Sequence, residues 1–189
     1  MMVFLKRLFL GSGRKRAVAR CYALVVEQSR RPGFYLWCGI PDSLDGRYEM
    51  LALHAFLVVH RLKGQGEAAR LFSRDFFEGM ITEMDCTVRE MGVGDMGVPP
   101  RVKRMVKGFN GRIVAYDRGI AGAGDDALLA ALDNNLFGTV LEPAPEALAR
   151  MAGYLRQAVA VLEAQPLEAL LAGEVCFPDP PPGDGGGAS

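Results

Sequence analysis

The stretch from residue 47 to residue 63 reads RYEMLALHAFLVVHRLK, and apolar side chains surround nearly its whole helical circumference. A surface helix keeps a polar face, whereas a helix that is apolar nearly all round lies inside a domain. We therefore predict a central, buried helix over residues 47–63. The helix is expected to end at Gly64 and Gly66, because glycine interrupts regular helix.

Helical periodicity recurs on both sides of this stretch, and strand alternation does not. Residues 100–120 have the clearest pattern, with their apolar side chains on one face at about 3.6 residues per turn. Further helices are predicted over residues 14–30, 67–91, 125–137 and 145–164, with a last turn over residues 166–172. The fold class is therefore all-α, a single-domain helical bundle of about six to seven helices.

The segment RPGFYLWCGIPDSLDG, residues 31–46, separates the first two predicted helices. Pro32 is expected to end the first helix, because the residue before a proline is pushed out of helical geometry. We predict a long aromatic loop between the two helices, and a loop this apolar must pack against something. Asp45 is the predicted N-cap of the central helix, and Glu49 lies near its first turn, where the helix dipole favours an acid.

The two ends of the chain differ from the helical domain predicted over residues 14–175. Residues 1–13 are apolar and basic, and far shorter than the roughly 20 apolar residues that span a bilayer. They form either an interfacial segment, with nearby arginines over anionic lipid, or a disordered start. Residues 176–189 are rich in proline and glycine and are predicted to be disordered.

The formal charge is zero, but the charges are segregated. Residues 1–31 carry eight Lys and Arg against a single acid, whereas residues 117–189 carry three Arg against eleven acids. The basic N-terminal segment, residues 1–31, has two interpretations. It is a solvated surface, or it faces an anionic neighbour such as lipid or RNA.

The motifs of common enzymes are missing from the sequence. Four scattered cysteines and two histidines have no spacing typical of a zinc site or a disulfide framework. The GxGxxG string at residues 92–97 follows a predicted helix instead of a strand, so it does not indicate dinucleotide binding. We predict no catalytic residue, no metal site and no cofactor, and we interpret His54 and His60 as hydrogen-bonded structural histidines.

Several charged residues are expected to pair between helices. Asp85 and Arg89 are spaced for an i,i+4 pair. Glu83 and Glu90 lie at the edge of an apolar face, where acids need partners, and Arg112 is the candidate partner for one of them.

Three segments resemble the ubiquinol-cytochrome c chaperone family, in the same order and with the same spacing. They are FYLWCGIPDSLDGRYEMLALHAFLVVHRLK at residues 34–63, MDCTVREMGVGDMGVPPRVKRM at residues 84–105 and FNGRIVAY at residues 109–116. The resemblance extends over about residues 22–120. Three departures are mild: Ile40 and Tyr48 stand where valine and phenylalanine are common, and Asn110 where the family often has an aromatic residue.

The resemblance implies a non-enzymatic assembly chaperone that binds nascent or newly inserted cytochrome b during biogenesis of complex III. It implies a bacterial member that is peripheral at the cytoplasmic face of the inner membrane, with that anionic membrane surface as a further partner. Mitochondrial relatives work near the ribosome, so the ribosome is a further partner to consider. DNA is not expected as a partner.

A chaperone for apolar segments needs an apolar docking surface rimmed by charge. The aromatic loop, the turn at residues 92–98 and the basic face of the helix over residues 100–120 are the candidates, unless the irregular segments only close the ends of the bundle. The partner-binding hypothesis comprises Phe34, Tyr35, Trp37, Pro41, Asp42, Arg47, Asp85, Arg89, Glu90, Asp95, Arg101, Lys103, Arg104, Lys107 and Arg112.

Two other classes of function stay open at this point. One is a helical enzyme acting on a lipid or a quinone, with Asp85, Glu90 and Asp95 as a carboxylate cluster. The other is a permanent small subunit of the respiratory complex.

Overall fold

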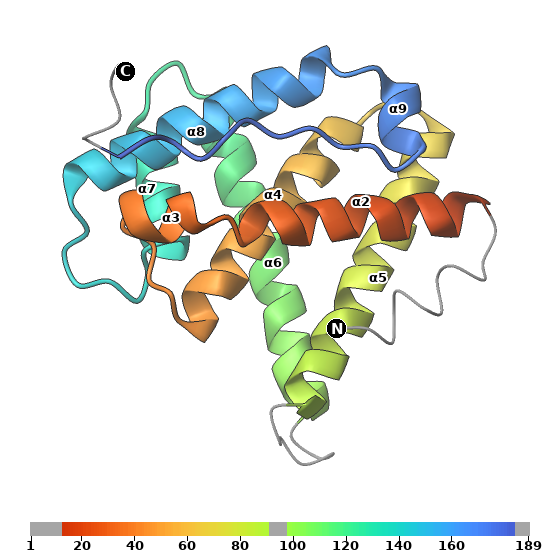
Figure 1. Cartoon of the computed structure of the whole chain (residues 1–189), viewed down its shortest axis with the longest axis horizontal. Helices are drawn as coiled ribbons and strands as arrows, with labels where there is room; N and C mark the ends of the chain where they lie inside the picture. The colour runs from red at the N-terminus through yellow and green to blue at the C-terminus, as the bar shows by residue number, and fades with distance from the viewer. Residues whose placement is uncertain (1–12, 91–97, 184–189) are drawn as a thin grey trace.

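The computed structural model describes residues 13–90 and 98–183, which are helical and contain no strand (Figure 1). The predicted all-α fold is confirmed. The helices in chain order are α2 (Gly13–Ser29), α3 (Pro32–Trp37), α4 (Leu44–Leu62), α5 (Glu67–Glu90), α6 (Val98–Ala121), α7 (Asp126–Asn135), α8 (Pro145–Ala164) and α9 (Leu167–Leu171).

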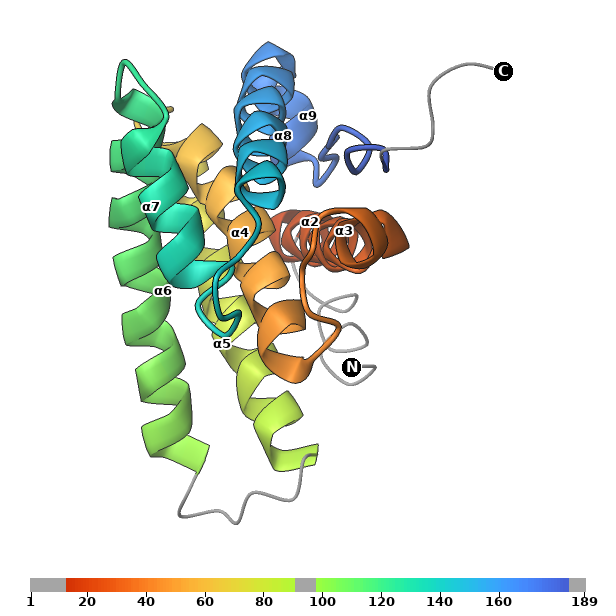
Figure 2. The same ribbon diagram turned by 90° about the vertical axis from the view of Figure 1, so that its left-hand side faces the viewer.

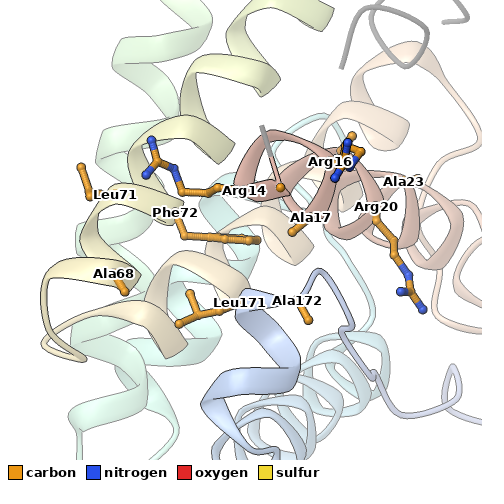
Figure 3. Close-up of a pocket in the computed structure, with 12 residues that line it drawn as sticks. Arg14, Arg16, Ala17, Arg20, Ala23, Ala68, Leu71, Phe72, Leu171 and Ala172 are labelled. Carbon is orange, nitrogen blue, oxygen red and sulfur yellow. The ribbon is translucent and has the colours of Figure 1, made fainter. Parts of the chain in front are cut away.

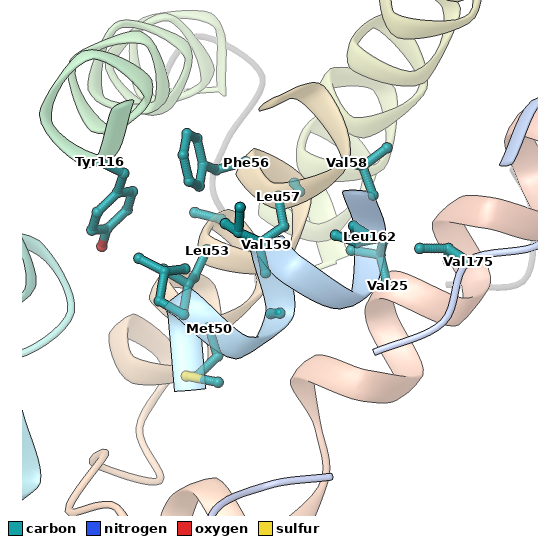
Figure 4. Packing of buried hydrophobic residues seen from close by; sticks show 14 of the residues in the cluster. Val25, Met50, Leu53, Phe56, Leu57, Val58, Tyr116, Val159, Leu162 and Val175 are labelled. Carbon is teal, nitrogen blue, oxygen red and sulfur yellow. The ribbon is translucent and has the colours of Figure 1, made fainter. Parts of the chain in front are cut away.

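Helix α4 is the centre of the bundle, as its sequence predicts. It packs against α2, α5, α6 and α8. Every residue from Ala52 to Val58 is buried, on all sides of the helix. Figure 4 shows why α4 is apolar on all sides: side chains of α2, α6 and α8 meet those of α4 from different directions.

Helices α5 and α6 lie side by side, and their joined ends project beyond the rest of the bundle (Figure 2). Within the bundle they are held by aromatic contacts. Phe77 stacks on Phe109 with their ring centroids 5.7 Å apart, and Tyr116 lies 5.2 Å from Phe56 of α4. Residues 91–97, which connect the two helices in the sequence, lie outside the described residues, as do residues 1–12 and 184–189.

The aromatic segment after α2 is helical, so the prediction of a continuous loop over residues 31–46 was wrong. Pro32 is near the N-terminus of α3, and Arg31 before it has the extended backbone of an N-cap. The first helical position needs no intrahelical N–H donor, so a proline that ends one helix can start the next. The irregular chain is therefore confined to Arg30, Arg31 and residues 38–43.

The N-cap of α4 is Ser43, and Asp45 lies in the first turn, which corrects the prediction that Asp45 is the cap. The hydroxyl of Ser43 accepts a hydrogen bond from the backbone N–H of Gly46 at 3.1 Å. Gly46 itself is required by a close approach, because a Cβ there would lie 2.0 Å from the carbonyl oxygen of Pro41. The loop can fold back over the start of α4 only where that side chain is absent.

The C-terminal segment packs on the bundle through residue 183, whereas the sequence predicts disorder from residue 176. The segment runs between α8 and α2 (Figure 1). The ring of Phe177 lies 5.2 Å from that of His54, and Gln28 of α2 donates to the carbonyl oxygen of Pro178 at 2.8 Å. Prolines lose little conformational freedom when they are ordered, so a few contacts suffice to hold the segment.

Candidate partner-binding surface

Helix α3 divides its large side chains between the core and the solvent. Phe34 is fully buried, with its ring centroid 4.9 Å from that of Tyr154 in α8. Leu36 and Trp37 lie on the other side and are 70% and 48% exposed. Few large apolar side chains are left this accessible in the described part of the chain, and two of them are neighbours on one short helix.

The first residues of α4 add a further exposed apolar side chain. Leu44 is 49% exposed and directly follows the N-cap. Beside it, the guanidinium Nε of Arg47 donates to a carboxylate oxygen of Asp42 at 2.6 Å, and both side chains face solvent. The hydrogen bond from Arg47 lowers the pKa of Asp42 below its ordinary value, so the pair is ionised at neutral pH. We call Leu36, Trp37, Asp42, Leu44 and Arg47 the α3–α4 surface.

The backbone of the α3–α4 surface is held in place by α8 and by the C-terminal segment. Arg150 of α8 donates to the carbonyl oxygen of Trp37 at 2.5 Å. The indole ring of Trp37 borders Gly183, where a Cβ would approach it to 2.9 Å. A side chain that is both exposed and fixed on one edge can contact a partner without a large loss of conformational freedom.

Three residues of the partner-binding hypothesis have structural roles instead. Phe34 belongs to the core, so its ring is not accessible to a partner, and its truncation would leave a cavity. Tyr35 is half-buried, and its hydroxyl donates to the carbonyl oxygen of Ser29 at the end of α2, at 2.7 Å. Pro41 is half-buried and shapes the loop through its contact with the start of α4.

Arg112 pairs with Glu49 of α4, so the prediction that it pairs with Glu83 or Glu90 was wrong. Its Nε donates to one carboxylate oxygen of Glu49 at 2.6 Å, and a terminal nitrogen contacts the other. The guanidinium also lies over the ring of Tyr48, whose hydroxyl donates to the backbone of Met105. This arrangement joins α4 to α6. The sequence signals were an acid near the start of α4 and a base at the edge of the apolar face of α6.

The two histidines are hydrogen bonded, which confirms their predicted structural role. His54 is fully buried between the carbonyl oxygen of Met50, 2.8 Å from Nδ1, and the hydroxyl of Tyr154, 2.7 Å from Nε2. His60 contacts the carboxylate of Asp117 in α6 at 2.7 Å.

The remaining predicted partner residues lie around the α5–α6 pair. Lys103, Arg104 and Lys107 are exposed on α6 and form a basic face. Asp85 is half-buried on α5. Asp95 lies outside the described residues, and the side chains of Arg89, Glu90 and Arg101 are not described either.

The structure does not bring the predicted candidates together at one place. The α3–α4 surface and the basic face of α6 are on different elements, and the carboxylate cluster hypothesised for an enzyme cannot be assembled from residues 13–90 and 98–183 alone. Within those ranges, no three His, Cys, Asp or Glu side chains gather in a way that would hold a metal ion. None of the helices described there has the length and apolarity needed to cross a bilayer.

Comparison with known proteins gives concordant results. The model of a family described as ubiquinol-cytochrome C chaperone matches residues 37–177. The chain is similar to the solved structure of the Cbp3 homolog from Brucella abortus, with a TM-score of 0.80 and 34% identity over 95% of this chain and 97% of that one.

Curated relatives bear the name ubiquinol-cytochrome c reductase complex assembly factor 1. The Xenopus laevis protein is 29% identical over 86% of this chain and 81% of its own length. The Homo sapiens protein is also 29% identical, over 86% of this chain, but the match spans only 54% of its length. The chain therefore spans about half the length of this longer relative.

Proposed function

Since the chain belongs to the ubiquinol-cytochrome c chaperone family, we propose that it assists assembly of the ubiquinol-cytochrome c reductase complex by holding newly made cytochrome b on the α3–α4 surface. The observation that carries the proposal is the exposure of three large apolar side chains, Leu36, Trp37 and Leu44, in one short stretch of the sequence, residues 36–44. Cytochrome b before assembly offers apolar helices joined by short polar loops, which need temporary apolar cover.

The composition of the α3–α4 surface fits such a partner. Tryptophan and other large side chains supply much of the binding energy at protein interfaces, and charged residues at the rim set orientation. Leu36, Trp37 and Leu44 supply the apolar part, and the exposed Asp42–Arg47 pair supplies the rim. The α3–α4 surface comprises only a few residues, and small interfaces give weak and reversible contacts. An assembly factor requires such a contact because it must release its client.

The site of action follows from the client. We propose that the chain works as a peripheral protein at the cytoplasmic face of the inner membrane, where newly inserted cytochrome b is accessible. Contact with the ribosome stays a prediction. The basic face formed by Lys103, Arg104 and Lys107 is the surface we assign to an anionic partner of that kind.

The test is a pull-down of the tagged chain from membranes of its own organism, with cytochrome b and the other complex III subunits quantified. A double variant, Leu36→Ser with Trp37→Ala, should recover at least about tenfold less cytochrome b, because loss of a central tryptophan weakens interfaces strongly. Val114→Ser is the matched control, because Val114 is 69% exposed but lies on α6.

Three results would count against the proposal. Full recovery of cytochrome b by the double variant, with an unchanged melting temperature, would show that the client docks elsewhere. Equal loss in the Val114→Ser control would show that the effect is not specific to α3. Stoichiometric recovery of the mature partner subunits with the wild-type chain would identify a permanent subunit instead of an assembly factor.

A further inference from the structure

A groove of about 890 Å³ lies at the other end of α2, on a part of the bundle that the proposed client surface does not use (Figure 3). Helix α2 forms one wall, and the first turns of α5 with the end of α9 form the others. The groove is partly open to solvent. Its lining consists of Gly13, Arg14, Arg16, Ala17, Ala19, Arg20, Ala23, Ala68, Leu71, Phe72, Leu171 and Ala172.

The lining combines only two kinds of chemistry. Three residues are arginines, all from α2, and the rest are apolar or glycine, with no acid among them. Phe72 is buried beneath the floor, while Leu71 and Leu171 are half-buried at its sides. A groove with this lining matches a molecule that has a hydrocarbon part and a negatively charged group.

The arginines are held at the two ends of the apolar floor. Arg14 extends to α5, where its Nε donates to Asp75 at 2.6 Å, and Arg74 contacts the same carboxylate at 3.0 Å. Arg20 extends the other way and lies 3.4 Å from Glu174 in the C-terminal segment. Both arginines stay substantially exposed in these pairs, so an incoming anion can still approach them.

We propose that this groove binds an anionic phospholipid of the membrane, with an acyl chain on the apolar floor and the phosphate against the α2 arginines that border it. Arginine suits this role because its planar guanidinium binds phosphate oxygens with two parallel hydrogen bonds. Lys15, exposed on the same turn of α2, adds a further positive charge beside the groove. The open side lets a lipid enter without leaving its leaflet completely.

Other anionic ligands fit less well. A nucleic acid is recognised by arginines together with exposed aromatic rings that stack on bases, and the one ring here is buried beneath the floor. An acidic peptide needs donors and acceptors for its backbone, and the apolar floor offers few side chains of that kind. A hydrocarbon chain is the ligand that best covers the apolar floor, because its binding removes apolar surface from water.

The experiment is flotation of the full chain with vesicles of phosphatidylcholine alone or with added phosphatidylglycerol. The wild type should float only with the anionic vesicles. Arg16→Gln with Arg20→Gln should weaken binding about 30-fold, because each basic residue near an anionic surface strengthens binding by about fivefold. Leu71→Gln tests the floor and should weaken binding at unchanged charge.

Matched controls sit on or beside α6, which α4 and α5 separate from α2 in Figure 2. Arg118→Gln of α6 with Lys63→Gln, whose ammonium contacts Asp117 of α6, removes the same charge. Val114→Gln makes the same kind of polar change as Leu71→Gln. Both controls should bind as the wild type does. Equal loss in the charge control would reduce the effect to general electrostatic attraction. Unchanged binding by Leu71→Gln would exclude an acyl chain on the floor.

A separate arm addresses residues 1–12 of the chain, which precede Gly13 of the lining. If Leu5→Glu with Phe9→Glu abolishes flotation while the groove variants bind normally, the segment and not the groove contacts lipid, and the proposal fails. No client is present in this assay. The recovery of cytochrome b in the pull-down therefore does not depend on the outcome of the flotation assay, and the two proposals can fail independently.

Discussion

Two polar clusters on α4 hold the bundle together in different ways. Near its middle, His54 lies in a fully buried chain of neutral groups that reaches Tyr154 of α8, Gln28 of α2 and the C-terminal segment. Near its start, Glu49 forms an ion pair with Arg112 of α6, where the two side chains are 12% and 16% exposed. In these two clusters, neutral hydrogen bonds serve the more deeply buried position, and the charged pair lies where more solvent remains.

The direction of the neutral chain follows from its partners. The carbonyl oxygen of Met50 can only accept, so Nδ1 of His54 carries the proton and Nε2 accepts from the hydroxyl of Tyr154. The oxygen of Tyr154 then accepts from the side-chain amide of Gln28 at 3.0 Å. Each polar atom named here is satisfied without a formal charge.

The largest expected effect comes from breaking the ion pair on one side. Arg112→Ala leaves the Glu49 carboxylate in a mostly buried position without its counter-ion, and should lower the free energy of unfolding by about 3 kcal/mol in urea denaturation. The double variant Glu49→Gln with Arg112→Gln should lose less, because it leaves no unpaired charge. A loss below about 1 kcal/mol for Arg112→Ala would contradict the importance assigned to the pair.

The neutral cluster predicts a dependence of stability on pH. Burial lowers the pKa of His54 to about 4, below its ordinary value of about 6.5 in the unfolded chain. The folded state then binds fewer protons, so this contribution is complete above about pH 6.5 and is lost as the pH falls toward about 4. The unfolding free energy should drop by roughly 2 kcal/mol between about pH 7 and pH 4.5.

The matched variant for this titration is His54→Gln, measured over the same pH series. It should be less stable than the wild type at neutral pH but show a flatter profile, because the titrating group is gone. Parallel profiles for the two proteins would mean that other groups, such as the carboxylates on the surface, account for the acid sensitivity.

The smallest effect concerns single hydroxyl groups. Tyr154→Phe removes the link between His54 and Gln28 and should cost about 1 to 2 kcal/mol, because buried polar atoms lose their partner. Tyr116→Phe is the control: its hydroxyl is buried with no hydrogen-bond partner among the described residues, so its removal should be neutral or stabilising. An equal loss of stability in thermal unfolding for Tyr154→Phe and Tyr116→Phe would show that ring packing, not hydrogen bonding, dominates at both positions.

Prediction from sequence worked where the signal was local and failed where it depended on a distant partner. The apolar circumference of residues 47–63 predicted the central helix, and the face of residues 100–120 predicted Phe109 and Tyr116 in the core. Arg112 was recognised as a base in need of an acid, but the wrong acid was chosen. Its actual partner is 63 residues away in the chain.

The candidate site shows the same limit. Composition marked residues 34–37 as an apolar segment that must pack or bind, yet nothing in the spacing said that Phe34 turns inward while Leu36 and Trp37 stay exposed. The groove beside α2 was anticipated only as a cluster of arginines. Its apolar floor comes from α5 and α9, which the chain places there through packing.

By itself, the sequence determined that this protein is helical, which segments form its long helices, which helix is central and which family it resembles. These properties depend on the period of apolar residues and on short motifs, and both are local. Tertiary structure alone decided which charges pair, which aromatic rings are exposed and that the proline-rich end is ordered through residue 183. Each of these depends on how much water the packed helices exclude around a group, and that is set by neighbours far away along the chain.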